Sequence, residues 1–157
     1  MLDNLIVGAS GFIGKKLLST LRETRRVSYT SRHGAGDSTA LDLQAPEDFN
    51  YSLLNPGDTI YLLAAISSPD ICRNQPELAR AVNVSGTSVF IRRAIDRGAK
   101  VIFFSSDTVY GNRSSGFDET AECDPVGDYA KMKCEVEDGF KADNNFKSVR
   151  LSYVFSY

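Results

Sequence analysis

The sequence predicts an α/β protein with a three-layer Rossmann fold: a doubly wound parallel sheet of strand order 3-2-1-4-5-6, with helices on both faces. Three observations carry this prediction. Short apolar runs alternate with amphipathic stretches along the chain. The first apolar run leads directly into a glycine-rich turn that opens a helical pattern. The length of 157 residues is that of one domain, and 42% apolar with 24% charged residues is typical of a globular protein.

The predicted elements follow one another in the order that such a sheet requires. Apolar runs predict six strands, at residues 5–7, 27–30, 39–43, 59–65, 100–105 and 147–153. Helical spacing of apolar residues, with Pro46 at a first helical position and Gly98 as a C-terminal cap, predicts the helices. These helices cover residues 15–24, 46–54, 77–97 and 128–141.

Composition argues against several classes of function. A net charge of −2 without a basic cluster argues against a nucleic-acid partner, and no apolar stretch is long enough to cross a membrane. The chain opens without the basic segment of a secretory signal. Its three cysteines, Cys72, Cys123 and Cys134, have no C-x-x-C spacing, which argues against a zinc site or a disulfide framework. We therefore expect a cytoplasmic protein that binds no metal.

A glycine loop, defined here as residues 8–14, follows the first strand. Gly8, Gly11 and Gly14 are spaced G-x-x-G-x-x-G at the start of a helix. Small residues there allow a tight turn, a close approach of the backbone to a pyrophosphate, and close packing of helix on strand. The helix N-terminus then offers unpaired N–H groups to the phosphates. The loop predicts a dinucleotide site; a tight turn without a ligand is the alternative.

The end of the second strand bears on the choice between NADP and NAD. An acidic residue there would accept hydrogen bonds from the adenosine ribose and repel a 2′-phosphate. Ser31 stands in that place, and Arg32 beside it can pair with a 2′-phosphate, unless it is simply a solvated loop residue. Asp42, after the third strand, is a candidate for contact with the adenine edge or a turn residue. The sequence favours NADP, with NAD as the alternative.

Two further signals predict proton transfer chemistry. Tyr129 and Lys133 lie one helical turn apart on one face. A neighbouring ammonium would lower the tyrosine pKa from about 10 and could hold the nicotinamide ribose; an ordinary surface pair is the alternative. Ser106 ends the fifth strand, at the edge where open α/β sheets bind ligands. It can bond the reacting oxygen of a substrate or merely cap local backbone. Ser67, after the fourth strand, is a substrate contact or a loop residue.

Together these motifs resemble the extended short-chain dehydrogenases/reductases of the NAD-dependent epimerase/dehydratase group. The matched stretches are residues 8–14, 62–65, 83–87, 105–111, 125–133 and 149–152. The resemblance implies Ser106, Tyr129 and Lys133 as catalytic residues and Ser67, Ser106 and Asp107 as substrate contacts. It implies a support role for Asn83 and a pocket wall at Ala64 and Ala65. The expected cofactor contacts are Gly8, Ser10, Gly11, Phe12, Ile13, Gly14, Ser31, Arg32, Asp42, Leu43, Ala64, Ala65, Asn83, Ser105, Tyr129 and Lys133.

Within this group, Asp107 followed by Val109 resembles the dTDP-4-dehydrorhamnose reductase branch, because hexose 4-epimerases more often carry a small neutral residue at the first of these positions. The resemblance also implies a homodimer through the long helices before Gly98 and after Tyr129. Val82, Val89 and Ile95 could serve that contact, although burial against the sheet explains them equally.

Family members continue for a hundred or more residues beyond this length, with the part that binds the sugar. The resemblance therefore implies that residues 1–157 form an NAD(P)-binding domain, with an incomplete sugar-nucleotide site and no activity by itself. The function it implies is an NAD(P)-dependent reductase acting on a keto group of a nucleotide-linked sugar. An NAD-dependent epimerase or dehydratase, and a dinucleotide-binding module without turnover, are the alternatives.

Overall fold

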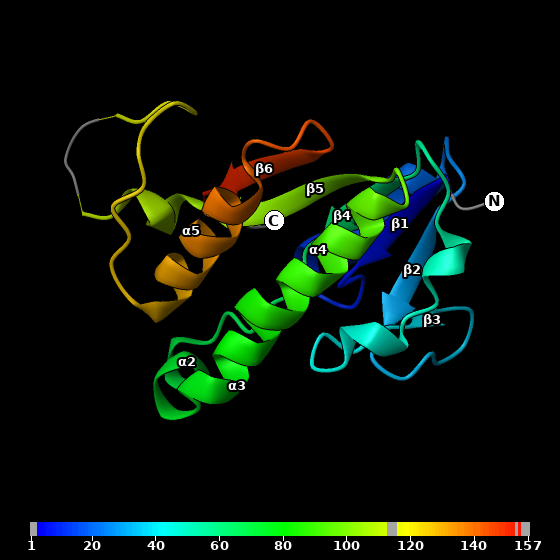
Figure 1. The fold of residues 1–157 in the computed structure, drawn as a ribbon, viewed down its shortest axis with the longest axis horizontal. Helices are drawn as coiled ribbons and strands as arrows, with labels where there is room; N and C mark the ends of the chain where they lie inside the picture. Colours follow the sequence, from blue (N-terminus) through cyan, green and yellow to red (C-terminus); the bar gives the residue numbers. More distant parts are fainter. Residues whose placement is uncertain (1–2, 113–115, 153, 155–157) are drawn as a thin grey trace.

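A sheet of six parallel strands forms the centre of the computed structural model, which describes residues 3–112, 116–152 and 154 (Figure 1). Within these residues the strand order is β3-β2-β1-β4-β5-β6, and every neighbouring pair is parallel, which confirms the predicted topology. The strands are β1 (Asn4–Val7), β2 (Ser28–Ser31), β3 (Thr39–Ala40), β4 (Thr59–Leu62), β5 (Lys100–Ser106) and β6 (Phe146–Leu151). Tyr153, the last residue of the sixth predicted strand, lies outside the described residues.

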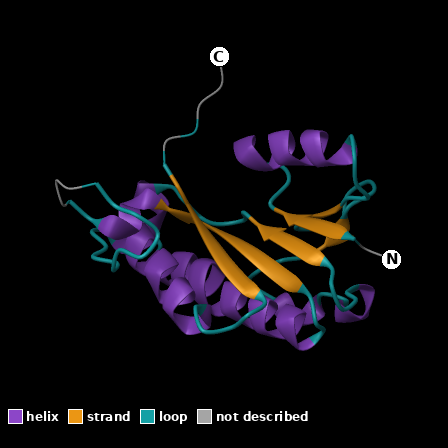
Figure 2. Cartoon of the chain, turned by 90° about the horizontal axis from the view of Figure 1, so that it is seen from above, coloured by secondary structure: helices purple, strands orange, loops and turns teal. Residues whose placement is uncertain are grey.

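The helices cover the two faces of the sheet unequally. They are α1 (Phe12–Arg22), α2 (Pro69–Asn74), α3 (Pro76–Arg80), α4 (Thr87–Asp96) and α5 (Asp128–Phe140). Figure 2 shows α1 by itself on one face, while the other helices gather on the opposite face. The central strand β1 is buried at all four residues, whereas the edge strand β6 is buried only at Phe146. Both faces of the sheet are thus best covered around β1.

The main core lies between the sheet and α4 with α5. Its fully enclosed side chains include Ile60 and Leu62 of β4 and Phe103 of β5, which pack against Phe90 and Ile91 of α4. Each such aliphatic or aromatic side chain contributes about 1.5–3 kcal/mol through its burial. This core fixes the strands whose carboxyl ends form the site described below.

The helix predicted over residues 77–97 is interrupted in the structure. Between α3 and α4 the chain forms a π-helical turn, η3 (Ala81–Gly86). The side-chain hydroxyl of Thr87 donates a hydrogen bond to the carbonyl of Val82 (2.9 Å) across this wide turn. Gly86 packs directly on the carbonyl oxygen of Leu43, where a Cβ atom has no space. Such π turns are rare and often occur at functional sites.

Three other predictions differ from the structure in detail. Residues 46–54 form two 3-10 turns, η1 (Pro46–Asp48) and η2 (Tyr51–Leu53), instead of one helix. The Asn50 side chain accepts a hydrogen bond from the Ser52 N–H (3.2 Å), and such local bonds compete with a continuous helix. Helix α2 and the 3-10 turn η4 (Asp107–Tyr110) fall in segments for which the sequence predicted neither a helix nor a strand.

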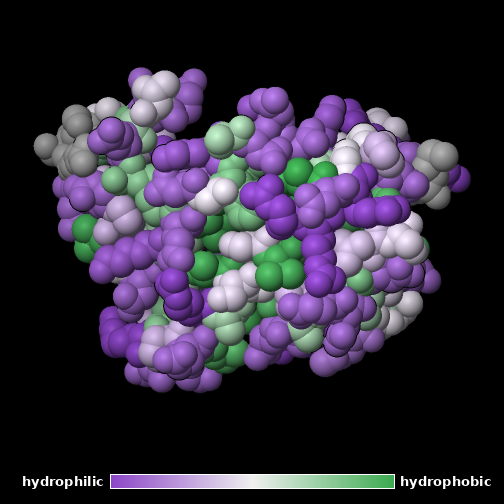
Figure 3. Space-filling model, in the orientation of Figure 1, coloured by the Kyte–Doolittle hydropathy of each residue, from purple (hydrophilic) through white to green (hydrophobic). Residues whose placement is uncertain are grey.

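The face that α4 crosses is largely hydrophilic, with hydrophobic residues in separate patches (Figure 3). This face includes the helices from which the sequence predicted a homodimer. Val82 is buried in the main core, and Ile95 packs against that core, so contact with the rest of the domain accounts for both residues. Within the described part of the chain, none of the helices combines the length and the apolar character that a membrane span requires.

Candidate functional site

A cavity of about 590 Å³ lies at the carboxyl ends of β1, β2, β4 and β5. This is the edge at which open α/β sheets bind ligands. Most residues predicted to form the site line this cavity. They are Gly8, Ser10, Gly11, Phe12, Ile13, Gly14, Ser31, Arg32, Asp42, Leu43, Ala64, Ala65, Ser67, Ser105, Ser106 and Tyr129.

Three predicted site residues, Asn83, Asp107 and Lys133, do not line the cavity. Conversely, several lining residues were not predicted, and most of them end a strand or follow its end. Many of these lining residues could have been predicted from the sequence, because they stand where an apolar run ends. The unpredicted lining residues are Val7, Thr30, Leu41, Leu63, Ile66, Val82, Phe104, Leu151 and Ser152.

The glycine loop is shaped by close contacts that leave no space for side chains. Gly8 has a φ of +96°, and a Cβ atom there would lie 2.6 Å from the backbone nitrogen of Ala64. A Cβ atom at Gly14 would overlap the carbonyl oxygen of Gly8. At Gly11 the nearest atom to a Cβ would be the Gly8 carbonyl oxygen at 3.5 Å, an ordinary contact distance, and Gly11 itself is exposed. The loop therefore leaves room for a group beside Gly11.

Helix α1 begins directly at this open position. Its N-cap, Gly11, provides no side-chain cap, and no acidic residue stands in the first turn. The first N–H groups of the helix are therefore left for an anion, which the helix dipole also favours. A dinucleotide pyrophosphate fits this end of the cavity, since the loop supplies space, N–H donors and no opposing charge.

Ser31, Arg32 and Asp42 line the cavity where β2 and β3 end. The Ser31 hydroxyl bonds the Ser38 hydroxyl (2.6 Å) and accepts from the Ala35 N–H (3.0 Å). The Arg32 side chain is 60% exposed and approaches Asp42 at 3.9 Å. Asp42 also accepts a hydrogen bond from the Gln44 N–H (2.9 Å), so its carboxylate serves the local turn as well. Arg32 is loosely held and can pair with an anion at the mouth of the cavity.

At the other end, Tyr129 and Lys133 share one face of α5. Lys133 is almost fully buried, its Nζ donates to the carbonyl of Phe104 (2.8 Å), and it lies 4.3 Å from the ring centroid of Phe103. Burial lowers the pKa of Lys133 to about 7, against a smaller opposing effect of Glu137. The lysine therefore stands just behind the cavity wall and titrates near neutral pH.

The sequence predicted that Lys133 lowers the pKa of Tyr129, but the structure shows a raised pKa. Burial of the phenol is the main cause, and the nearby Cys72 adds to it. The Lys133 Nζ lies 5.6 Å from the Tyr129 ring centroid and bonds a carbonyl instead. A lysine that is itself destabilised as a cation cannot stabilise a phenolate strongly. Tyr129 is therefore a neutral phenol at physiological pH in this structure.

Ser106 and Ser105 bring two hydroxyls to the same end of the cavity. The Ser106 oxygen accepts hydrogen bonds from the Thr108 N–H (3.2 Å) and the Thr108 hydroxyl (2.9 Å). Its own hydrogen points toward Asp107 at the long distance of 3.4 Å, so it remains available to a stronger acceptor. Among the described residues, the Ser105 hydroxyl is the one buried side-chain oxygen without a hydrogen-bond partner. A buried unpaired hydroxyl that lines a cavity is suited to a polar ligand.

Asn83 acts on the cavity through the backbone of Ile66. Its side-chain oxygen accepts from the Ile66 N–H and its nitrogen donates to the Ile66 carbonyl, both at 2.8 Å. Asn83 is 3% exposed and sits in the π-helical turn η3. The side chain thereby fixes the segment after β4, including Ala64 to Ser67, that lines the cavity.

Comparisons with known proteins agree on one family. The family model described as "RmlD substrate binding domain" matches residues 3–157. The 4-epimerase for N-acetyl-alpha-D-glucosaminyl-diphospho-ditrans,octacis-undecaprenol of Escherichia coli O157:H7 is 33% identical over 144 residues, which are 88% of this chain and 43% of that protein. Methionine adenosyltransferase 2 subunit beta of Xenopus tropicalis is 30% identical over 145 residues, 85% of this chain and 41% of the relative. The chain spans about half the length of the curated relatives it matches.

Solved structures with the same fold include complexes with nicotinamide dinucleotides. dTDP-4-dehydrorhamnose reductase from Bacillus anthracis str. Ames in complex with NADP has a TM-score of 0.79 and 26% identity, over 99% of this chain and 55% of that chain. MoeE5 in complex with UDP-glucuronic acid and NAD has a TM-score of 0.80 and 26% identity, over 94% of this chain and 54% of that chain. Structural neighbours thus hold either dinucleotide, and one of them also holds a nucleotide sugar.

Proposed function

This chain belongs to the RmlD substrate-binding domain family, and on that premise we propose that it is the NADP-binding part of a reductase for nucleotide-linked keto sugars. One observation carries the proposal: a single cavity joins the glycine loop to Ser106 and Tyr129. An anion-binding loop at one end and proton donors at the other are what hydride transfer to a carbonyl needs. The same residues in an epimerase or dehydratase would use NAD.

The cofactor would be held along the whole cavity. The glycine loop and the first N–H groups of α1 would bind the pyrophosphate. Arg32 would pair with a 2′-phosphate, and Ser105 and Lys133 would take the polar groups of the nicotinamide ribose. Ser105 has no other partner for its hydroxyl among the described residues, which supports this role. When bound, NADPH supplies the hydride.

The chain's own residues would move the proton and orient the substrate. Tyr129 is protonated at neutral pH because its pKa is raised, and a neutral phenol is the form that donates a proton to a keto oxygen. The Ser106 oxygen already accepts two hydrogen bonds from Thr108, and its hydrogen, which meets Asp107 only at 3.4 Å, would turn to donate to the same keto oxygen. This protonation state favours the reducing direction.

The first experiment is calorimetric titration of the chain with NADPH, NADP, NADH and NAD. We expect the two phosphorylated dinucleotides to bind more tightly than the other two. In Arg32→Ala, affinity for NADP should fall about tenfold or more, since a charge-assisted hydrogen bond is lost, while affinity for NAD stays nearly unchanged. Arg25→Ala is the matched control, because Arg25 is exposed and does not line the cavity.

Equal affinity for NAD and NADP, unchanged in Arg32→Ala, would contradict the NADP assignment. Failure of all four dinucleotides to bind would contradict the proposed site itself. Turnover is tested separately, in a longer form of the protein that includes a sugar-binding part, by following NADPH oxidation with a nucleotide-linked 4-keto sugar with and without the Tyr129→Phe substitution. The phenylalanine variant should bind NADPH normally and lose turnover, since it keeps the ring and removes the proton donor.

A dinucleotide-binding module without turnover is the second candidate. The similarity to methionine adenosyltransferase 2 subunit beta favours it, because that relative is named as a subunit. Under this function NADPH would bind, and no keto sugar would be reduced by the chain or by any longer form of the protein. Reduction that depends on Tyr129 would decide against it.

A further inference from the structure

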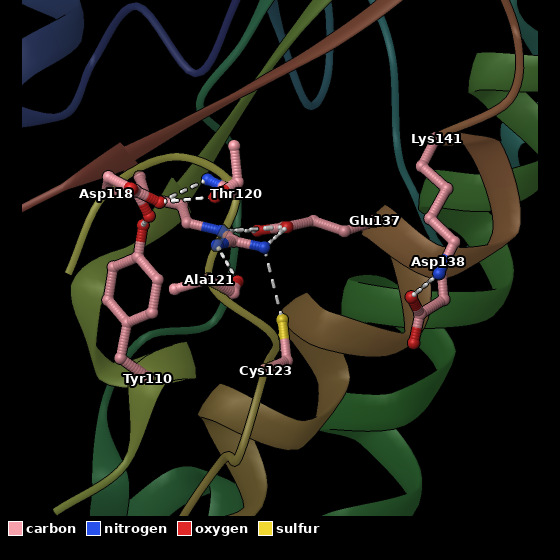
Figure 4. A network of polar contacts seen from close by, with 9 residues as sticks. Tyr110, Asp118, Thr120, Ala121, Cys123, Glu137, Asp138 and Lys141 are labelled. Atoms are coloured by element: carbon pink, nitrogen blue, oxygen red, sulfur yellow. Dashed lines mark hydrogen bonds and ion pairs between the residues drawn. The ribbon is translucent and has the colours of Figure 1, made fainter. Parts of the chain in front are cut away.

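The cavity that the glycine loop, Ser106 and Tyr129 line is called the dinucleotide cavity. Outside it, Arg150 of β6 joins the loop before α5 to the body of that helix. Its guanidinium bonds both carboxylate oxygens of Glu137, with the shortest contact at 2.7 Å (Figure 4). It also donates to the carbonyl of Ala121 (3.0 Å) and to the Sγ atom of Cys123 (3.3 Å). The guanidinium of Arg150 thus holds Cys123 near the side of α5 that carries Glu137.

Cys134 lies on that same side of α5. It precedes Glu137 by three residues, and residues three apart on a helix are neighbours on one face. After burial, the neighbouring Cys123 is the next cause that raises the pKa of the Cys134 thiol, and the Arg150 guanidinium contacts both the Cys123 Sγ atom and Glu137, which lies one helical turn from Cys134. Two cysteines with no recognisable spacing in the sequence are therefore brought together by a loop, a helix and a strand.

We propose that Cys123 and Cys134 form a reversible redox pair, which a small-molecule disulfide such as oxidised glutathione converts to an intramolecular disulfide. The Cys123 thiolate attacks one sulfur of the glutathione disulfide, and one glutathione leaves as its thiol. Cys134 then attacks the Cys123 sulfur, the mixed disulfide breaks, and the second glutathione leaves. The protein gives up two electrons and two protons, and one glutathione disulfide becomes two thiols.

The order of these steps follows from exposure. Cys123 is partly exposed and lines a second cavity, of about 690 Å³, between the loop, α5 and β6. Cys134 is 5% exposed. Burial raises the pKa of Cys134 to about 12, and its contact with Cys123 and the nearby Asp138 and Glu137 add to this. The oxidant therefore meets Cys123 first, and closure of the disulfide should be faster at higher pH.

The disulfide would tie the loop to the helix that carries Tyr129 and Lys133. The loop is already anchored at its other side, because the N–H of Asp124 donates to the carbonyl of Val109 (2.9 Å). Neither Cys123 nor Cys134 lines the dinucleotide cavity. Oxidation should therefore stabilise this region and leave dinucleotide binding nearly unchanged, so the proposal does not depend on the function proposed above.

The test equilibrates the chain in glutathione buffers of graded redox potential, blocks free thiols, and maps tryptic peptides by mass spectrometry. The expected product links the peptides of residues 114–131 and 134–141, with the loss of two hydrogen atoms, and it disappears on reduction. The oxidised form should melt about 6–12 °C higher than the reduced form. Cys72→Ser should still form the link, whereas Cys123→Ser and Cys134→Ser should not.

Two outcomes would overturn the proposal. One is a chain that ends as a mixed disulfide between Cys123 and glutathione while Cys134 remains a thiol. The other is a link between different chains or through Cys72. The cysteine variants must first show the circular dichroism spectrum and melting temperature of the reduced wild type. If either variant fails to fold, the peptide map of Cys72→Ser decides the question.

Discussion

The two ends of the dinucleotide cavity are built on different physical principles. At the glycine loop, backbone atoms pack against backbone atoms, and Gly8 and Gly14 leave no room for a side chain. At the opposite end, Lys133 and Ser105 are polar groups buried in the protein, one bonded to a carbonyl and the other unpaired. The first end is fixed by shape alone, whereas the second depends on charge and hydrogen bonding that a ligand can change.

This difference predicts how each end responds to mutation and to pH. Steric contacts between backbone atoms are insensitive to pH and intolerant of any added atom. Buried polar groups tolerate changes of similar shape, and their energies vary with protonation. Substitutions and changes of pH therefore affect the two ends of the cavity differently.

The largest effect is expected from Gly14→Ala. The new Cβ atom would overlap the Gly8 carbonyl oxygen, so the loop or the start of α1 must move. We expect about 3 kcal/mol loss in the free energy of unfolding and dinucleotide binding weakened about 100-fold or more, measured by urea denaturation and calorimetry. Gly139→Ala is the matched control: nothing lies within 4 Å of a Cβ there, and it should stabilise α5 by about 0.5–1 kcal/mol.

If Gly14→Ala keeps wild-type affinity for the dinucleotide, the glycine loop does not bind the pyrophosphate. If it loses affinity without loss of stability, the steric account of the loop is wrong. Gly139→Ala is a matched control because both substitutions add one methyl group to a helix, so a difference between them reflects the steric contact at Gly14.

A narrower effect, on stability and not on dinucleotide binding, is expected where α5 is attached to β6. The Glu137 and Arg150 side chains are 6% and 16% exposed, and Glu137→Gln would leave a buried guanidinium without its counter-charge. The free energy of unfolding should fall by about 3 kcal/mol. Asp138→Asn is the control, because its pair with Lys141 is more than half exposed and should contribute at most about 1 kcal/mol. Equal losses in the two variants would mean that burial does not set the strength of these pairs.

The two ends also differ in how far the sequence predicted them. The glycine loop depends on residues next to one another in the chain, so its spacing and its place after a strand were sufficient. The strand order likewise followed from local patterns, and the structure confirms it. Where neighbours in the chain determine the structure, the sequence was enough.

The remaining features depend on distant residues. The π-helical turn coincides with Gly86 packing on the Leu43 carbonyl, which no helical pattern reveals. The direction of the Tyr129 pKa shift follows from burial, and burial of Lys133 against Phe103 becomes visible only in the folded chain. The position of Cys123 beside α5 likewise involves Arg150 of the last strand. These features could not have been predicted from spacing.

The pH dependence of stability tests the buried lysine. Because the pKa of Lys133 falls from 10.5 to about 7 on folding, the unfolded chain binds more protons between these values. The free energy of unfolding should therefore rise with pH in this window relative to Lys133→Met, by at most about 1.4 kcal/mol per pH unit. Below pH 7 both states are protonated and the difference is constant. Urea denaturation of both proteins across the window measures it, and parallel curves would contradict a buried lysine with a lowered pKa.

The smallest effect is proton uptake on dinucleotide binding. Ribose hydroxyls that accept a hydrogen bond from Lys133 favour its ammonium form, so binding should raise the pKa of a group that titrates at about 7. At pH 7 this corresponds to uptake of up to about half a proton, which calorimetry in buffers of different ionisation enthalpy detects. The uptake should vanish in Lys133→Met and persist in Arg32→Ala, because Arg32 lies at the other end of the cavity from Lys133. Uptake that survives in Lys133→Met would place the titrating group elsewhere, and the second end of the cavity would then be fixed by shape like the first.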